Sequence, residues 1–273
     1  MTAVEHRGVT ARRRARRTLL LGAGAGAATM AGFGYYSIFG PSSQLFGELP
    51  HRGTTRENVV ALTFDDGPNE PFTSQLVHLL GEKHVPATFF QVGKCVERHP
   101  GLSARMVEAG HVIGNHSYSH RLLRYLTEPS LGSEIGRAQA VLEAEIGHRP
   151  ALFRPPWLCH QPPLMVEAAR QGLRVVSGSF AHPLEVAQIP AWRIARRAVN
   201  LARPGAILIF HDGFDARGGF RGQTVEAVRL VVDELKGRGF RFTTIDKMLD
   251  VPAYQDLTTR SQGSPLDSSE DPD

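Results

Sequence analysis

Residues 59–68 read VVALTFDDGP, a nearly continuous apolar run that ends in two aspartates, a glycine and a proline. Similar short apolar runs recur along the chain, and each is followed by a stretch in which apolar residues recur with helical spacing. Buried strands that alternate with amphipathic helices indicate a parallel sheet covered by helices. The runs occupy residues 59–64, 87–92, 111–115, 151–154, 174–180, 206–210 and 240–245.

The order of these seven runs favours an α/β fold in which the sheet forms a barrel, although the alternation leaves closure of the barrel undecided. In such barrels the chemistry lies where strands end and loops begin. Four of the predicted strands end in segments rich in acids, histidines or arginine. These segments contain Asp65 and Asp66, His116 and His120, Arg154 and Trp157, and His211 and Asp212.

Each of these groups has an ordinary explanation when taken alone, because acids, glycine and proline favour turns and a buried histidine is often a core residue. His116 and His120 are four residues apart, so both imidazoles lie on one face of a helical turn, where they could hold one metal ion. Two histidines and one carboxylate leave open positions on a divalent cation, as a hydrolytic site requires. A further carboxylate and histidine would supply a base and an acid. We therefore expect the four strand ends to meet in one cleft.

In this order, the residues closely resemble the polysaccharide deacetylase family (carbohydrate esterase family 4, the homology domain of nodulation-type chitooligosaccharide deacetylases). The family motif T-F-D-D-G-P is present at 63–68 and H-S-x-x-H at 116–120. The motif R-x-P plus an aromatic is present at 154–157, with Trp where Tyr is commoner, and an apolar strand that ends in His is present at 207–211. The resemblance covers about 57–250. It implies a distorted (β/α) barrel of about seven parallel strands, in agreement with the alternation.

The resemblance also implies a metal cofactor. Asp66, His116 and His120 would hold a divalent ion, which is typically Zn²⁺ in this family and sometimes Co²⁺ or another divalent metal. The metal would stabilise negative charge on the acetyl oxygen as water attacks the carbonyl.

The remaining roles are implied in the same way. Asp65 would be the general base that takes a proton from the attacking water, and Arg154 would orient Asp65 and keep it ionised. His211 would protonate the leaving amine. The backbone N–H of Trp157 would help to stabilise the oxyanion, and Ile209 would line the pocket for the acetyl methyl group.

One segment departs from the family pattern. After the fifth predicted strand the family carries an Asp that supports the catalytic histidine or the arginine, whereas residues 177–185 contain no Asp. His182 or Glu185 could take its place, and the sequence does not decide between them; His182 could equally be a loop residue without a role. The pKa of His211 depends on this choice.

The favoured function is removal of N-acetyl groups from a cell-wall or chitin-like polysaccharide, with peptidoglycan first. An O-acetyl xylan esterase uses the same motifs and is the alternative within the enzyme class. A carbohydrate-binding protein that lost turnover is the alternative outside it, motivated by the altered segment. A glycosidase with paired carboxylates is less favoured, because its two carboxyl groups stand on the order of 5–10 Å apart across a sugar, and Asp65 and Asp66 already have roles.

The N-terminal residues predict a location outside the cytoplasm, with the protein either anchored to the membrane or secreted. The net charge is +4, but residues 1–17 hold six arginines and one acid, so the remainder is close to neutral and nucleic-acid binding is not indicated. An uncharged stretch follows, which predicts an export signal or a transmembrane anchor in contact with the membrane. The pair Arg16-Arg17 resembles a twin-arginine export signal.

These features predict the domain organisation. We expect a basic n-region at 1–17, a signal or anchor at 18–40, a linker at 41–57, the catalytic domain at 58–250 and a disordered tail at 251–273. Cys95 and Cys159 are the only cysteines, and their wide separation favours two unpaired thiols over a disulfide.

Overall fold

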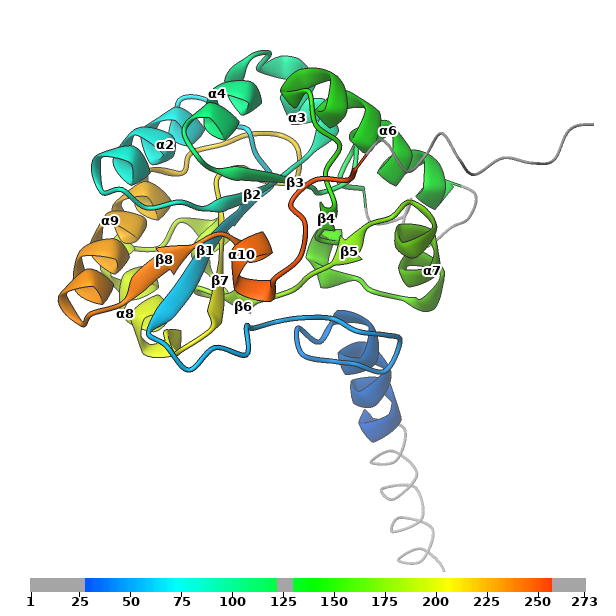
Figure 1. Ribbon diagram of the computed structural model, residues 1–273. Helices are drawn as coiled ribbons and strands as arrows, with labels where there is room; N and C mark the ends of the chain where they lie inside the picture. Colours follow the sequence, from blue (N-terminus) through cyan, green and yellow to red (C-terminus); the bar gives the residue numbers. More distant parts are fainter. Residues whose placement is uncertain (1–27, 122–129, 257–273) are drawn as a thin grey trace, which may run out of the picture.

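The computed structural model describes residues 28–121 and 130–256, in which a curled parallel sheet lies at the centre and helices wrap around it (Figure 1). A helix over residues 28–39 precedes the first strand. The strands are β1 (Val59–Asp65), β2 (Thr88–Gln91), β3 (Val112–Asn115), β4 (Leu152–Phe153), β5 (Arg174–Val175), β6 (Ser179–Phe180), β7 (Ala206–His211) and β8 (Arg241–Thr243). The helices are α2 (Phe72–Glu82), α3 (Gly93–Arg98), α4 (Leu102–Glu108), α6 (Ser130–Ile146), α7 (Pro162–Arg170), α8 (Ala191–Leu201), α9 (Gly222–Gly237) and α10 (Ile245–Leu249), with short 3₁₀ turns η1 (Pro156–Leu158) and η2 (Glu185–Ala187).

The sheet has the order β5-β4-β3-β2-β1-β7-β6, with β8 paired to β1, and every pairing is parallel. Strand β8 pairs with residues 59–61 of β1, whereas β2 pairs with residues 63–65. Strand β7 pairs with β1 along residues 60–65 and occupies one edge of β1. Strands β2 and β8 therefore both pair with the other edge, at opposite ends of β1. The predicted distorted (β/α) barrel is confirmed.

The fifth predicted strand, 174–180, is divided into β5 and β6, so the described residues form eight strands where the sequence predicts seven. Its first half pairs with β4 and its second half with β7, and these halves are the two ends of the sheet order. One bent segment of chain therefore joins both edges of the sheet. At the bend the chain presses closely on β7, because a Cβ at Gly178 would lie 2.9 Å from atoms of Ile207 and Ile209.

Successive side chains of β1 point alternately toward the covering helices and toward the barrel interior. Val60, Leu62 and Phe64 belong to the large apolar cluster that the strands form with α2, α8 and α9. Ala61 belongs to a second cluster with Phe90, Leu152 and Ile207. Because strand side chains alternate with period two, Asp65 shares the face of Ala61 and points into the barrel.

The segments that flank the catalytic domain are packed against the barrel where they are described. Leu49 is 1% exposed, and Pro50 accepts a hydrogen bond from the backbone N–H of Ser177 (2.8 Å). Near the other end, Ala151 donates a backbone hydrogen bond to Ala253 (2.9 Å). Residues 1–27, which include the first ten residues of the predicted signal or anchor, and residues 257–273 lie outside the described residues, so the domain limits stay a prediction.

Two further expectations concern the membrane segment and the cysteines. In the described parts of the chain, no helix has the length and apolar character needed to cross a bilayer. Cys95 and Cys159 are both buried and free, as the sequence favours.

Candidate metal centre and catalytic cleft

The register of β1 decides where the two aspartates lie. Asp65 is the last residue of β1 and is level with His211 of the neighbouring strand β7. Asp66 follows with φ of 75°, in the left-handed region, so the chain turns and the two carboxylates point to different sides. Gly67 permits the turn, because a Cβ at this position would lie 2.0 Å from Oδ2 of Asp212.

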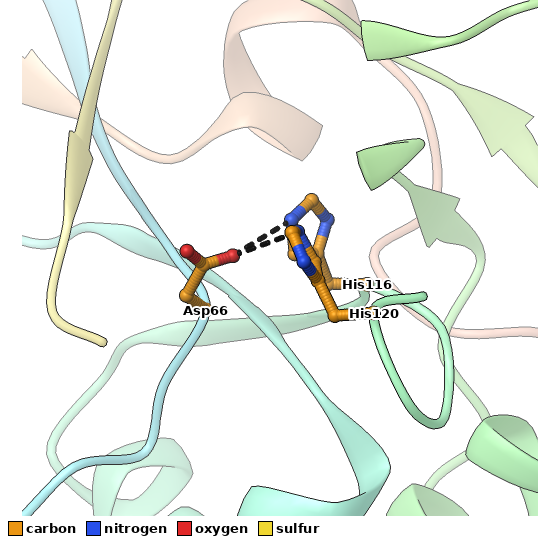
Figure 2. A group of neighbouring side chains, drawn as sticks. All are labelled: Asp66, His116 and His120. Carbon is orange, nitrogen blue, oxygen red and sulfur yellow. Dashed lines mark ion pairs between the residues drawn. The ribbon is translucent and has the colours of Figure 1, made fainter. Parts of the chain in front are cut away.

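Asp66 faces the two histidines of the third strand end (Figure 2). Its Oδ1 lies 3.3 Å from Nε2 of His116 and 3.0 Å from Nε2 of His120. All three side chains are buried, and their ligand atoms lie within 4.8 Å of one another. The structure thus brings together the three residues that the sequence assigns to a metal.

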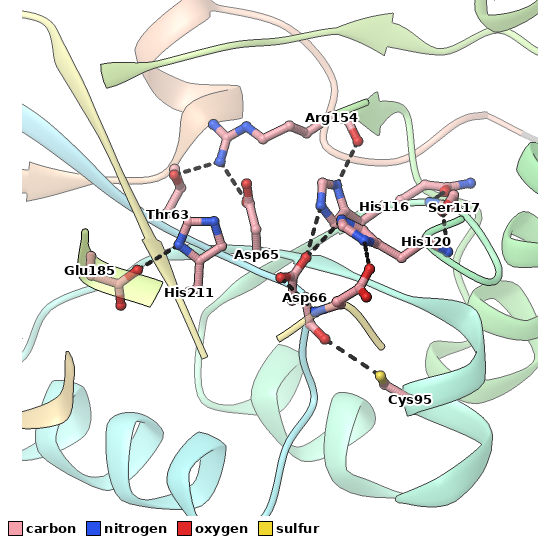
Figure 3. A network of polar contacts seen from close by, with 12 residues as sticks. Thr63, Asp65, Asp66, Cys95, His116, Ser117, His120, Arg154, Glu185 and His211 are labelled. Carbon is pink, nitrogen blue, oxygen red and sulfur yellow. Dashed lines mark hydrogen bonds and ion pairs between the residues drawn. The ribbon is translucent and has the colours of Figure 1, made fainter. Parts of the chain in front are cut away.

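In both imidazoles Nδ1, the nitrogen that does not face Asp66, lies against a hydrogen-bond acceptor (Figure 3). Nδ1 of His116 lies 2.7 Å from the carbonyl oxygen of Arg154, and Nδ1 of His120 lies 3.0 Å from Oδ1 of Asp215. Because a carbonyl and a carboxylate only accept, each Nδ1 carries the proton and donates it. In a neutral imidazole this leaves the Nε2 lone pair free to bind a cation.

Asp215 was not identified from the sequence. It also donates its backbone N–H to Oδ2 of Asp66 (3.1 Å), so it contacts two members of the trio. No spacing relates Asp215 to His120, which is 95 positions away in the chain. Only the fold brings the loop after β7 against the histidine pair.

The trio fits a divalent cation. Two ligands at about 2.0–2.1 Å from a tetrahedral zinc ion stand roughly 3.3 Å apart, close to the separations found here. Within the described residues, Oδ1 of Asp66 accepts no well-aligned hydrogen bond. Burial alone would raise the pKa of Asp66, but His120 and His116 together, with a smaller contribution from His211, hold that pKa well below its usual value. Burial acts to lower the pKa of His120, but the charges and hydrogen bonds of Asp66 and Asp215 together outweigh it and raise that pKa. A bound metal would displace a proton held between Oδ1 of Asp66 and the Nε2 atoms of the two histidines.

The contact between Asp215 and His120 gives a prediction about metal affinity. Asp215→Asn keeps an acceptor for Nδ1 but removes the charge that makes the imidazole a stronger ligand, so we expect affinity for Zn²⁺ to fall about 10–100-fold. Competition with a chromophoric chelator measures the affinity. Asp233→Asn, on the exposed face of α9, removes the same charge far from the site and serves as the control. An unchanged zinc affinity in Asp215→Asn would show that the contact does not tune the ligand.

Asp65 is held by a buried arginine. Nη1 of Arg154 donates to Oδ1 of Asp65 (2.8 Å) and to Oγ1 of Thr63 (2.7 Å), and Nη2 donates to the carbonyl of Ser177 (3.1 Å). The Arg154 side chain is fully buried, with its guanidinium 4.2 Å from the centroid of the Phe90 ring. These contacts fix one orientation of the Asp65 carboxylate and leave its charge paired.

The altered segment after β6 supplies the partner of His211. Oε2 of Glu185, which is 1% exposed, lies 2.7 Å from Nδ1 of His211, and Thr224 donates its hydroxyl to the other carboxylate oxygen. His182 has a different contact, because its Nδ1 accepts the backbone N–H of Leu184 (3.0 Å). Burial acts to lower the pKa of His211, but Glu185 raises it to about 9. Of the two candidates that the sequence leaves open, Glu185 contacts His211.

The metal trio, Asp65 and His211 line one cleft of about 430 Å³. Trp157 forms part of its wall, with φ of 55° and its ring centroid 4.2 Å from that of His120. Ile209, which the resemblance assigns to the acetyl pocket, is 1% exposed and pairs with Phe180 of the adjacent strand. Of these two described residues, Phe180 lines the cleft and Ile209 does not. The apolar part of the wall is completed by Pro155, Leu158, Pro183, Val186 and Phe214.

Comparisons with known proteins agree with this geometry. A sequence model described as polysaccharide deacetylase matches residues 52–176. The chain is 32% identical over 210 residues to a peptidoglycan-N-acetylglucosamine deacetylase of Bacillus cereus, covering 77% of this chain and 94% of the relative. It is 33% identical over 198 residues to a chitooligosaccharide deacetylase of Azorhizobium caulinodans, covering 69% and 93%.

Solved structures show the same similarity. A crystal structure of a peptidoglycan N-acetylglucosamine deacetylase superposes with a TM-score of 0.70 at 29% identity, covering 76% of this chain and 95% of the other. A family 4 acetyl xylan esterase from Clostridium thermocellum, in complex with a cobalt ion, superposes with a TM-score of 0.64 at 32% identity, covering 72% and 94%.

Proposed function

Since the chain belongs to the polysaccharide deacetylase family, we propose that it is a metal-dependent hydrolase that removes N-acetyl groups from a cell-wall polysaccharide, with peptidoglycan favoured over a chitin-like polymer. One observation carries the proposal: a buried Asp-His-His trio, an arginine-held carboxylate and a glutamate-held histidine share one cleft. A binding protein without turnover has no need of all three.

Asp66, His116 and His120 are the proposed ligands of the cation, which when bound would polarise the acetyl carbonyl and lower the pKa of water. Nitrogen and carboxylate donors in this number suit zinc, and cobalt is the ion present in the acetyl xylan esterase. Zinc is therefore our first choice and cobalt our second.

The protein's own groups supply the proton transfers. Asp65, fixed by Arg154, accepts a proton from the water that attacks the carbonyl carbon. His211 donates a proton to the nitrogen as the amide bond breaks, because an amine leaves only after it is protonated. The raised pKa of His211 keeps it protonated at neutral pH, which supports this role. The backbone N–H of Trp157 is the proposed donor to the oxyanion, and Ile209 is proposed to support the acetyl-binding wall from behind.

The second candidate is O-acetyl xylan esterase, which the similarity to the Clostridium thermocellum enzyme favours. An ester releases a sugar hydroxyl group, which depends less on a proton donor than an amine does. The buried pairing of His211 with Glu185 therefore favours the amide substrate.

We propose that the protein works outside the cytoplasmic membrane, exported or anchored by its N-terminal segment, with the arginine pair as a twin-arginine signal. The described end of this segment supports contact with a membrane surface. In the helix over residues 28–39, Met30, Phe33 and Tyr35 are exposed. Nucleic acid is not a proposed partner.

Acetate release by the full-length chain tests the proposed function. Peptidoglycan, N-acetylglucosamine oligomers and acetylated xylan are offered separately, with Zn²⁺ and after treatment with a chelator. We expect release from the first two, loss of that release to the background rate after chelation, and recovery with Zn²⁺ or Co²⁺. Release from xylan alone would favour the esterase, and bound metal without release from any substrate would favour a binding protein.

A further inference from the structure

A second cavity, of about 450 Å³, lies beside the catalytic cleft along helix α8. Figure 1 places α8 on the outside of the sheet next to α9. Two rows of side chains line the cavity, because residues four apart in a helix lie above one another. The lining consists of Trp192, Arg196 and Asn200, of Arg193, Arg197 and Leu201, and of His182.

The three arginines of α8 have no acidic partner in the part of the chain that the structure describes. Among residues 28–121 and 130–256, no carboxylate forms an ion pair with Arg193, Arg196 or Arg197. The neighbouring helix α9 differs, because its Arg229 and the residue that follows its last turn, Arg238, both pair with acids of α9. Like charges three and four residues apart in a helix repel, so this cluster does not serve the stability of α8.

The aromatic ring in the cavity orders part of the cluster. The guanidinium groups of Arg193 and Arg196 lie 5.3 Å and 5.5 Å from the centroid of the Trp192 ring. Such cation–π contacts limit the motion of two long side chains and so reduce the entropy that a ligand has to overcome. Trp192 remains 52% exposed, so the cluster is open to a large ligand.

His182 connects this cavity to the catalytic cleft, because it lines both. A polymer that leaves the cleft past His182 therefore meets Arg197 and Arg193 next. The charges of these arginines act on His182, because its pKa is lowered first by burial and then by Arg197 and Arg193. Because the two cavities meet at His182, one extended molecule can span both.

We propose that His182 and the α8 side chains form an anionic subsite that binds carboxylate groups on the same glycan strand whose acetyl group is removed. The inference rests on the deacetylase function proposed above and specifies its substrate as an acidic glycan. Guanidinium groups bind carboxylates through paired, charge-assisted hydrogen bonds, whereas a neutral N-acetylglucosamine polymer offers no partner. Peptidoglycan, in which alternate sugars carry a carboxyl group or a carboxylate-bearing peptide, has the required chemistry.

Kinetics on two substrates tests the subsite. The double variant Arg193→Gln/Arg197→Gln removes two charges and keeps most of each side-chain stem, and Arg170→Gln/Arg229→Gln removes two charges elsewhere as the control. For each protein, kcat/KM is measured on N-acetylglucosamine oligomers and on peptidoglycan glycan fragments of equal length. We expect the acidic-to-neutral ratio of kcat/KM to fall about tenfold or more in the α8 variant, mainly through KM, and to stay at the wild-type value in the control. Equal losses on both substrates would overturn the proposal.

Binding separates failure of the subsite from failure of the function. Both fragments are titrated calorimetrically into Asp65→Asn, with and without the two α8 substitutions. Tighter binding of the acidic fragment that the α8 substitutions abolish supports the subsite even if the wild-type protein releases no acetate. Equal affinities for the acidic and neutral fragments would refute it even if acetate is released.

Discussion

Asp65→Asn is expected to lower kcat for acetate release about 10²–10⁴-fold, the range for loss of a general base, while zinc affinity stays near the wild-type value. The asparagine side chain has the same shape, and its carbonyl oxygen can still accept the hydrogen bond from Arg154. It cannot accept a proton from water. Steady-state acetate release, together with zinc content per protein, measures both parts of this prediction.

The substitution also tests the role of the buried arginine. Arg154 is fully buried and would lose its charged partner, so we expect the free energy of unfolding to fall by about 3–5 kcal/mol. Rates are therefore compared at a temperature where circular dichroism shows the variant to be folded. Asp250→Asn, an aspartate outside the site, is the matched control. A folded, zinc-loaded Asp65→Asn with wild-type kcat would exclude Asp65 as the base.

Glu185→Gln is expected to move the alkaline limb of the pH–kcat profile to lower pH and to lower kcat at pH 8 by at least tenfold. His211 acts in its protonated form, and Glu185 raises its pKa to about 9 against the effect of burial. Without the negative charge, burial dominates and the pKa falls, so His211 loses its proton at a lower pH. A bound divalent cation lowers the pKa of His211 in both the wild type and Glu185→Gln. The pKa of His211 is therefore still lower in the variant than in the wild type.

The control for this profile is Glu167→Gln, which removes one carboxylate from an exposed ion pair on α7. Its pH–kcat profile should superimpose on that of the wild type. If Glu185→Gln also leaves the alkaline limb in place, the limb belongs to another group and His211 is not the acid.

Much of the fold could be predicted from the sequence because each strand is a compact apolar run followed by helical spacing. The division of 174–180 could not, since both halves have the residue types of one strand. The division depends on which neighbour each half meets, β4 or β7, and that is settled only by the curled arrangement of the sheet.

The candidate site divides in the same way. The trio of Asp66, His116 and His120 lies in short motifs, so local spacing is enough to propose it. Glu185 and Asp215 support His211 and His120 from 26 and 95 positions away, and no periodicity relates such pairs. The sequence leaves Glu185 as one of two candidates and does not indicate Asp215, so both are assigned to their histidines only when the loops after β6 and β7 are placed.

The bend at residues 176–178 has a consequence for how this scaffold can change. Because Ser177 is between the two ladders, its carbonyl is free to hold Arg154, and its N–H contacts the segment before β1. The exposed face of α8 lies away from this bend and from Glu185, so selection or engineering can vary its side chains to suit new polymers. An insertion at the bend would instead release the edge of the sheet and the support of Asp65 together. The side chains of α8 can therefore evolve separately from the bend that supports Asp65.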